Sequence, residues 1–198
     1  MGLTNYPNGL SSFGIPVLGG AMVPFGKSSK AFFVHPAEGS DGNDGTTPKK
    51  ALASLSAAHS KMTAGKNDVC FLMGNGLTSG TARESATLSW TKDACHLIGV
   101  AAPGFQAQRA RISLASGVSD VTPLMQVSAD GCYFSNIHLF QNFASDATNV
   151  CVELTGARTV WENCHIAGGG NATGADNAGM RSLLITGGSG LGEHYFKN

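Results

Sequence analysis

Two glutamates in the second half of the chain have the side chains that enzymatic chemistry would require most directly. Glu153 lies within the apolar run 150–154, and Glu162 lies within the similar segment 160–166. Glycoside hydrolysis needs two carboxylates on either side of the sugar bond, and a lyase would need calcium and a proton-abstracting base. Alternation along a strand sends Glu153 outward. Exposed carboxylates on strands are usually only solvated, so we assign no catalytic residue.

Histidines and cysteines give a weaker chemical signal. His138 and His165 occupy equivalent places in two similar segments, so we expect them to stack as outward neighbours about one strand spacing apart. A surface histidine pair carries no chemistry on its own. The cysteines lack CxxC spacing and are expected to be small buried apolar side chains. They are Cys70, Cys95, Cys132, Cys151 and Cys164.

The loop at residues 38–48 contains aspartate, asparagine and glycine in a pattern that suggests a calcium site. Its spacing does not fit an EF-hand, and the same residue types build ordinary turns. Two Cys-His dipeptides suggest metal binding, yet neighbours on one strand point to opposite faces. We therefore predict neither a metal site nor a cofactor.

A short motif occurs three times in the second half of the chain. Each copy has an aromatic residue, a one-residue spacer and an asparagine. The aromatic residues are Phe134, Trp161 and Phe196, the asparagines are Asn136, Asn163 and Asn198, and an apolar run precedes each copy at 124–127, 150–154 and 182–186. Similar strands at irregular spacing indicate stacked coils with loops of variable length, which is typical of a β-solenoid. Each coil is expected to contribute at least two strands.

A bend is expected inside each copy of the motif. Phe134 and Ile137 are an odd number of positions apart, so a flat strand would point them to opposite faces. Asn136 lies between them, and asparagine tolerates the left-handed conformation that a sharp corner needs. Asn163 and Asn198 fall at the equivalent corner. Stacked asparagines could hydrogen-bond along the axis, so we predict an interior ladder.

Residues 1–30 differ from the rest because proline and glycine interrupt apolar residues throughout. This spacing opposes both helix and sheet, while the apolar content opposes a free, solvated tail. We predict an extended docking arm that lies on its own domain, on a sibling subunit or on another protein. The residues expected to bind the partner are Tyr6, Pro7, Phe13, Ile15, Pro16, Val17 and Leu18.

The solenoid itself is expected to span residues 31–198. A helix near residues 48–62, with Leu52, Leu55, His59 and Met62 on one face, would cap its open end. The last motif copy stops at Asn198. An open coil end leaves unpaired backbone groups, so we expect a longer protein or a capping partner chain.

Composition agrees with a structured protein. Charged residues make up 13% of the chain, there are 27 glycines, and the formal net charge is zero. The chain has no basic run, no apolar stretch long enough for a membrane span and no signal-peptide pattern at its start. We predict no nucleic-acid partner, no membrane association and no export by the general pathway.

The order of these elements resembles the pectate-lyase-like right-handed parallel β-helix superfamily. The resemblance covers residues 31–198 and includes the 33–34 strand, the 39–46 loop, the helix starting at Pro48 and the repeated aromatic-x-Asn coils. It implies an all-β fold but leaves function open, because the superfamily contains polysaccharide lyases, hydrolases, phage tailspikes and non-catalytic virion proteins. Residues 5–19 also resemble the start of tailed-phage virion proteins of the capsid.

These resemblances imply a structural virion protein of the capsid decoration, or cement, type. Its expected partner is the major capsid protein, its expected state is a homotrimer, and its expected place is the capsid surface after assembly in the host cytoplasm. The alternative is a phage tailspike or fibre protein that binds or degrades host polysaccharide on the β-helix flank.

Overall fold

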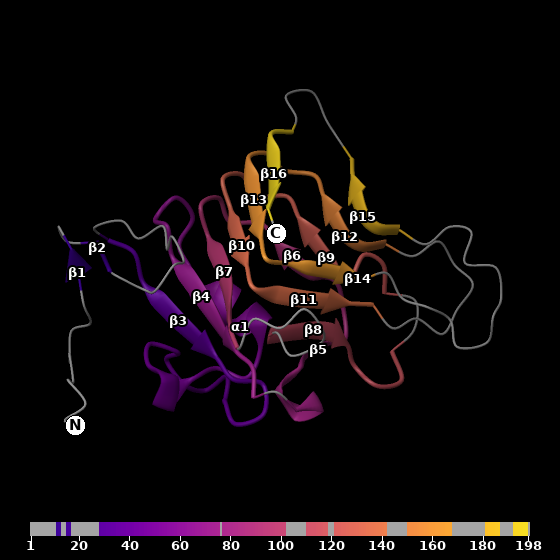
Figure 1. Cartoon of the computed structure of the whole chain (residues 1–198). Helices are drawn as coiled ribbons and strands as arrows, with labels where there is room; N and C mark the ends of the chain where they lie inside the picture. The colour runs from indigo at the N-terminus through magenta and orange to yellow at the C-terminus, as the bar shows by residue number, and fades with distance from the viewer. Residues whose placement is uncertain are drawn as a thin grey trace, which may run out of the picture.

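The chain forms a right-handed parallel β-helix with three sheets, as the sequence predicts (Figure 1). The computed structural model describes residues 11–12, 15–16, 28–75, 77–101, 110–118, 121–141, 150–167, 181–186 and 192–197. Within these residues, no helix is both long and apolar enough to cross a membrane.

All strand pairs within the three sheets are parallel. Sheet I contains β3 (Ala31–Val34), β4 (Val69–Met73), β7 (His96–Val100), β10 (Tyr133–Ser135), β13 (Thr159–Glu162) and β16 (His194–Lys197). Sheet II contains β5 (Ala82–Glu84), β8 (Ala110–Leu114), β11 (Ile137–Phe140) and β14 (His165–Ala167). Sheet III contains β6 (Leu88–Trp90), β9 (Met125–Val127), β12 (Val150–Leu154) and β15 (Arg181–Ile185).

The chain visits sheets I, II and III in turn, so each full coil contributes three strands. Strands β4, β7, β10, β13 and β16 therefore lie side by side in Figure 1, although loops of different length separate them in sequence. Strands β5 and β6 are not predicted from the sequence. Each has only three residues, which is too short for alternation to be distinguished from a loop.

The core is a column of apolar side chains that stack in register from coil to coil. Cys70 pairs with Leu97, Leu97 with Phe134, and Phe134 with Trp161, and all four are buried. The rings of Phe134 and Trp161 are stacked with their centroids 4.1 Å apart. Four of the five cysteines are buried free thiols, as predicted, and Cys164 is partly buried.

The corner between sheets I and II has the predicted conformation. Asn136 and Asn163 have φ angles of 54° and 52°, in the left-handed region. Because a single residue bends the chain there, Phe134 and Ile137 both point inward and are fully buried. The bend predicted from their odd spacing is confirmed.

The hydrogen bonds of Asn136 differ from those of the predicted ladder. Its side-chain amide donates to the carbonyls of Gly99 and Ala101 on the preceding coil, at 2.9 and 3.0 Å. Its Oδ1 is buried and has no hydrogen-bond partner among the described residues. The Asn136 side chain therefore connects to the backbone of the preceding coil, because the left-handed turn points its amide toward that coil. Asn198 lies outside the described residues.

A second left-handed corner, which the sequence analysis did not find, precedes the strands of sheet I. Four successive coils have a positive φ there, at Asn67, Ala94, Gly131 and Arg158. Aspartates connect the coils beside it: the Asp93 carboxylate accepts from the Asp130 amide, and the Asp130 carboxylate accepts from the Ala157 amide, both at 2.8 Å. Aspartate side chains thus also connect neighbouring coils, through backbone amides.

The capping helix is shorter than predicted. A 3-10 turn, η1 (Pro48–Lys50), and the helix α1 (Leu55–Lys61) replace one helix over residues 48–62. Leu52 breaks the helix because its backbone is extended and bridges to Val34. Ser54 then caps α1 by accepting from the Ala57 amide. The predicted apolar face is buried, and α1 packs against β3, β4 and β6.

The structure describes residues 11–12, 15–16 and 28–30 of the predicted arm. Strands β1 (Ser11–Ser12) and β2 (Ile15–Pro16) pair in antiparallel fashion. The expectation that this segment forms no sheet ladder is therefore wrong for these four residues, because Pro16 lies at the end of a two-residue strand, where proline is tolerated. A second 3-10 turn, η2 (Thr78–Gly80), connects β4 to β5.

Replacing Gly99 by alanine should destabilise the β-helix strongly. Gly99 occupies the corner position one coil before Asn136, and an added Cβ would overlap the Asn136 carbonyl oxygen and approach the Ala110 Cβ to 2.8 Å. We expect Gly99→Ala to lower the free energy of unfolding by roughly 1–3 kcal/mol in urea denaturation. Gly42→Ala is the control, since its Cβ would meet only Ser40 Oγ at 3.6 Å. Equal stabilities of the two variants would contradict the packing described.

Candidate functional site

The junction between the predicted arm and the β-helix is firmly held. Asp68 is buried, and its carboxylate accepts from the amides of Lys30 and Thr63 at 2.7 and 2.8 Å. The Ser29 hydroxyl also donates to the Lys66 carbonyl at 2.8 Å. Asp68 therefore fixes the end of the arm to the segment that follows α1 and to the start of β4.

Of the residues predicted to bind a partner, most lie outside the described part of the chain. These are Tyr6, Pro7, Phe13, Val17 and Leu18. Ile15 and Pro16 form β2. Their role in docking remains a prediction.

Glu153 lies on the outer face of sheet III. It is in register with Gln126 on one side and Leu184 on the other. Gln126 donates to its Oε2 at 3.1 Å, and the Thr186 hydroxyl donates to its Oε1 at 2.9 Å. Both carboxylate oxygens thus connect neighbouring coils.

Glu162 lies on the outer face of sheet I. The Tyr133 hydroxyl donates to its Oε2 at 2.6 Å, and Lys197 pairs with its Oε1 at 3.0 Å. The hydrogen bond from Tyr133, together with Lys197, lowers the pKa of Glu162. A general acid needs a raised pKa, so this environment opposes that role. The two glutamates belong to different sheets and do not form the facing pair that hydrolysis requires.

His138 and His165 stack on the outer face of sheet II, as predicted. They are register partners, and their rings are parallel within 5° with centroids 4.4 Å apart. His138 is nevertheless buried, with 8% exposure, while His165 is exposed. Arg111 is the register partner of His138 on its other side. Arg111, His138 and His165 therefore form one row across the neighbouring strands β8, β11 and β14.

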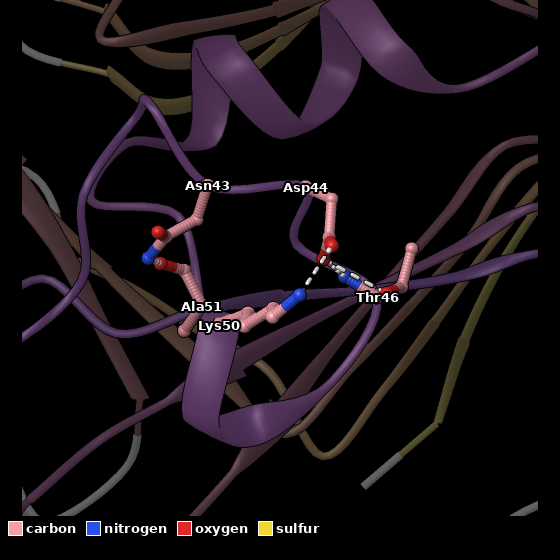
Figure 2. Close-up of polar contacts among 5 residues, drawn as sticks. All are labelled: Asn43, Asp44, Thr46, Lys50 and Ala51. Atoms are coloured by element: carbon pink, nitrogen blue, oxygen red, sulfur yellow. Dashed lines mark hydrogen bonds and ion pairs between the residues drawn. The ribbon is translucent and has the colours of Figure 1, made fainter.

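The loop that suggested calcium binding is held by its own hydrogen bonds (Figure 2). Asp44 Oδ1 accepts from the amide and the hydroxyl of Thr46 at 2.9 and 2.8 Å, and Lys50 Nζ lies 3.4 Å from Asp44 Oδ2. The Asn43 side chain donates to the Ala51 carbonyl at 2.8 Å. The oxygens of Asp44 therefore organise the turn around η1.

Asp41, in the same loop, connects it to α1. Its carboxylate accepts from the amides of Ala53 and Ser54 at 2.8 and 2.9 Å and from the Ser54 hydroxyl at 2.8 Å. Partial burial raises the pKa of Asp41, but the hydrogen bonds from Ser54 and Ala53 outweigh it and lower the pKa overall. Within the described part of the chain, no group of three histidine, cysteine, aspartate or glutamate side chains is arranged to hold a metal ion.

A cavity of about 300 Å³ lies between α1 and the turn from β5 to β6. Its walls include Glu84 and His59 together with Ser56, Ser60, Ser85 and Ser89. Burial, with a smaller contribution from Asp41, raises the pKa of Glu84 to about 7, and burial, with a smaller contribution from Lys92, lowers the pKa of His59 to about 4. The cavity thus favours the neutral forms of both side chains.

Sequence reasoning missed Glu84 because a charged residue in a three-residue strand gives no sign of facing inward. Glu84 is the register partner of Leu114, which belongs to the core. Lys92 was also missed. Its ammonium donates to the carbonyls of His59, Ser60 and Met62 at 2.6–2.8 Å and so satisfies the C-terminal end of α1.

Comparison with solved structures found a pectin methylesterase variant crystallised in complex with a hexasaccharide. The similarity has a TM-score of 0.56 at 17% sequence identity and covers 86% of this chain and 48% of that chain. The chain therefore spans about half the length of that structure. At this identity the similarity shows the fold alone, a right-handed parallel β-helix. No protein-family model matches the chain, and no curated protein sequence matches it.

Glu84 should make stability fall as the pH rises. Because its pKa is raised to about 7 in the folded protein, its penalty is absent below the unfolded pKa and complete above about pH 7. Glu84→Gln should therefore be more stable than the wild type at pH 8 by roughly 1–3 kcal/mol, and similar to it near pH 4.5. Urea unfolding across this pH range measures the difference. Exposed Glu38→Gln is the control, and a constant difference between Glu84→Gln and wild type across pH would contradict the assignment.

Proposed function

We propose that the chain is a non-enzymatic structural protein of a phage particle, which docks through residues 1–30 and presents its β-helix outward. The supporting observation is the junction at Asp68, which fixes the end of the arm to the first coil. In this proposal the protein is a capsid decoration protein, its partner is the major capsid protein, and it acts as a homotrimer on the capsid surface after assembly in the host cytoplasm.

The position of the junction favours this arrangement. Strand β3 follows the arm directly and is the first strand of sheet I, next to β4 (Figure 1). The arm therefore enters the fold at one end of the stack of coils. A partner that held the arm would hold the β-helix by this end, and the remaining coils would project from it as a rigid body.

The state of the two glutamates opposes the enzymatic alternative. Catalytic carboxylates of a hydrolase must face the same sugar bond. Glu153 is hydrogen-bonded on sheet III, and Glu162 is hydrogen-bonded on sheet I. These contacts instead connect neighbouring coils, which is a structural role.

A second candidate is a tailspike or fibre protein that binds host polysaccharide on the β-helix flank. The observation that favours it is a hollow of about 320 Å³ on the outer face of sheet II, whose lining includes Arg83 and Arg111. In the similar pectin methylesterase structure, a β-helix of this type is in complex with a hexasaccharide. Binding of this kind needs no catalytic pair and is compatible with docking through the arm.

Removal of residues 1–27 should abolish docking without unfolding the β-helix, because Ser29, Lys30 and Asp68 remain. We expect the full chain to co-sediment with empty heads of its phage, and the truncated chain to stay in the supernatant with an unchanged melting temperature. Phe13→Ser combined with Leu18→Ser should weaken binding in the same direction, and Thr4→Ser serves as the matched control. Binding to isolated tails alone, or binding to heads without the arm, would overturn the proposal.

A further inference from the structure

The cavity between α1 and the turn from β5 to β6 is lined by a buried carboxyl group whose charge nothing nearby compensates. Glu84 lines this cavity of about 300 Å³ and is only 9% exposed. Among the described residues, none donates a hydrogen bond to its carboxyl group, and none of their ion pairs includes it. A buried carboxylate is costly unless a donor or a positive charge accompanies it. The cavity is therefore a place where a positively charged ligand would gain a counter-charge.

The basic side chains around the cavity are already used elsewhere. His59 Nε2 accepts from the Thr91 amide at 3.3 Å, and its ring packs on Trp90 with the centroids 4.6 Å apart. Burial holds the pKa of His59 at about 4, so its ring is neutral near pH 7. The Lys92 ammonium has three N–H donors and directs them to three carbonyls at the C-terminal end of α1. Neither side chain therefore neutralises Glu84.

Two hydroxyl groups of the lining have only lone pairs to offer a ligand. Ser60 Oγ donates its proton to the Ala57 carbonyl at 2.7 Å, and Thr87 Oγ1 donates its proton to the Pro123 carbonyl at 2.8 Å. A hydroxyl carries a single proton, so both oxygens can act toward a ligand only as acceptors. Together with Glu84, they form a lining that accepts hydrogen bonds and carries negative charge.

We propose that this cavity binds a small organic cation that carries a primary ammonium group. Such a group has one positive charge and three N–H donors, which match the Glu84 carboxylate and the hydroxyl acceptors. Hydrogen bonds between charged partners are about twice as strong as neutral ones. Asp41 lies near enough to contribute to the raised pKa of Glu84, so it adds negative potential at the site. The inference does not rest on the proposed docking role of the arm.

An ammonium group fits this lining better than a metal ion does. Calcium takes six to eight oxygen ligands, usually with several carboxylates, and magnesium demands near-ideal octahedral geometry. Glu84 is the only carboxylate among the described residues that line the cavity. The volume is instead close to the lower end of the range for small-molecule sites, about 300–1,000 Å³. It is sufficient for an amine with a short alkyl chain.

An NMR titration of the full chain with n-butylammonium chloride, at pH 8 in a phosphate buffer free of amines, tests the proposal. We expect saturable shifts of the backbone amides of Ser60, Glu84 and Ser89, which lie on both sides of the cavity. n-Butanol has the same alkyl chain without the charge and should cause no such shifts. Tetramethylammonium has the charge without N–H donors and should bind more weakly.

Variants of Glu84 separate the charge from the fold. Glu84→Gln should weaken binding of n-butylammonium about tenfold or more, the loss expected for one charge-assisted contact. Glu84→Asp keeps the charge and should retain part of the affinity. Glu38→Gln removes the same charge at an exposed position and should leave the affinity unchanged. Melting temperatures of all three variants check that each is folded.

The pH dependence gives an independent readout. The pKa of Glu84 is about 7, so lowering the pH from 8 to 5.5 protonates it and should weaken binding in the wild type. His59 is neutral at both pH values, and Asp41, with its lowered pKa, is ionised at both. No saturable shifts with n-butylammonium, an equal response to n-butanol, unchanged affinity in Glu84→Gln or at pH 5.5, or tighter binding of Mg²⁺ or K⁺ at the same amides would each overturn the proposal.

Discussion

The left-handed corner between sheets I and II is the constraint on which the rest of the structure depends. Asn136 and Asn163 each turn the chain in a single residue, so the strands on both sides place apolar side chains inside. A corner of two residues would reverse the inward and outward sets of sheet II. The left-handed conformation costs most residues about 1–2 kcal/mol but asparagine less, which explains the residue type at both positions.

Because this corner sets the register, it also decides which polar side chains share an outer face. Glu153 pairs with Gln126 on sheet III, Glu162 with Tyr133 on sheet I, and the row of arginine and histidine side chains lies on sheet II. Glu153 and Glu162 connect neighbouring coils on sheets III and I, whereas Arg83 and Arg111 line a hollow on sheet II.

Much of the fold could be predicted from the sequence because solenoid strands have strong local patterns. The bounds of β4, β7 and β12 and the bend at Asn136 follow from apolar runs, glycine-rich turns and parity. The helix over residues 48–62 was wrong in extent, because Leu52 pairs with Val34 and a distant strand overrides local helix preference. Ser54 was a signal for the true start, since serine is a favoured N-cap.

The candidate site was harder to predict. Arg83 and Arg111 are far apart in sequence and meet only because β5 and β8 pair through a coil of variable length. The hydrogen bonds of Asp93 and Asp130 to the next coil could not be predicted either, because they depend on the register between coils. Local periodicity shows that a side chain faces outward, but the neighbours it meets there are set by loop lengths that no local pattern encodes.

The most direct test of this account compares the Asn136→Gly and Asn136→Ala variants in urea unfolding. Both variants lose the amide hydrogen bonds to Gly99 and Ala101, but only alanine brings a Cβ into the left-handed corner. The account predicts that Asn136→Ala is the less stable of the two by about 1 kcal/mol or more. Equal stabilities would contradict it, because the corner would then not depend on a residue that tolerates the left-handed conformation.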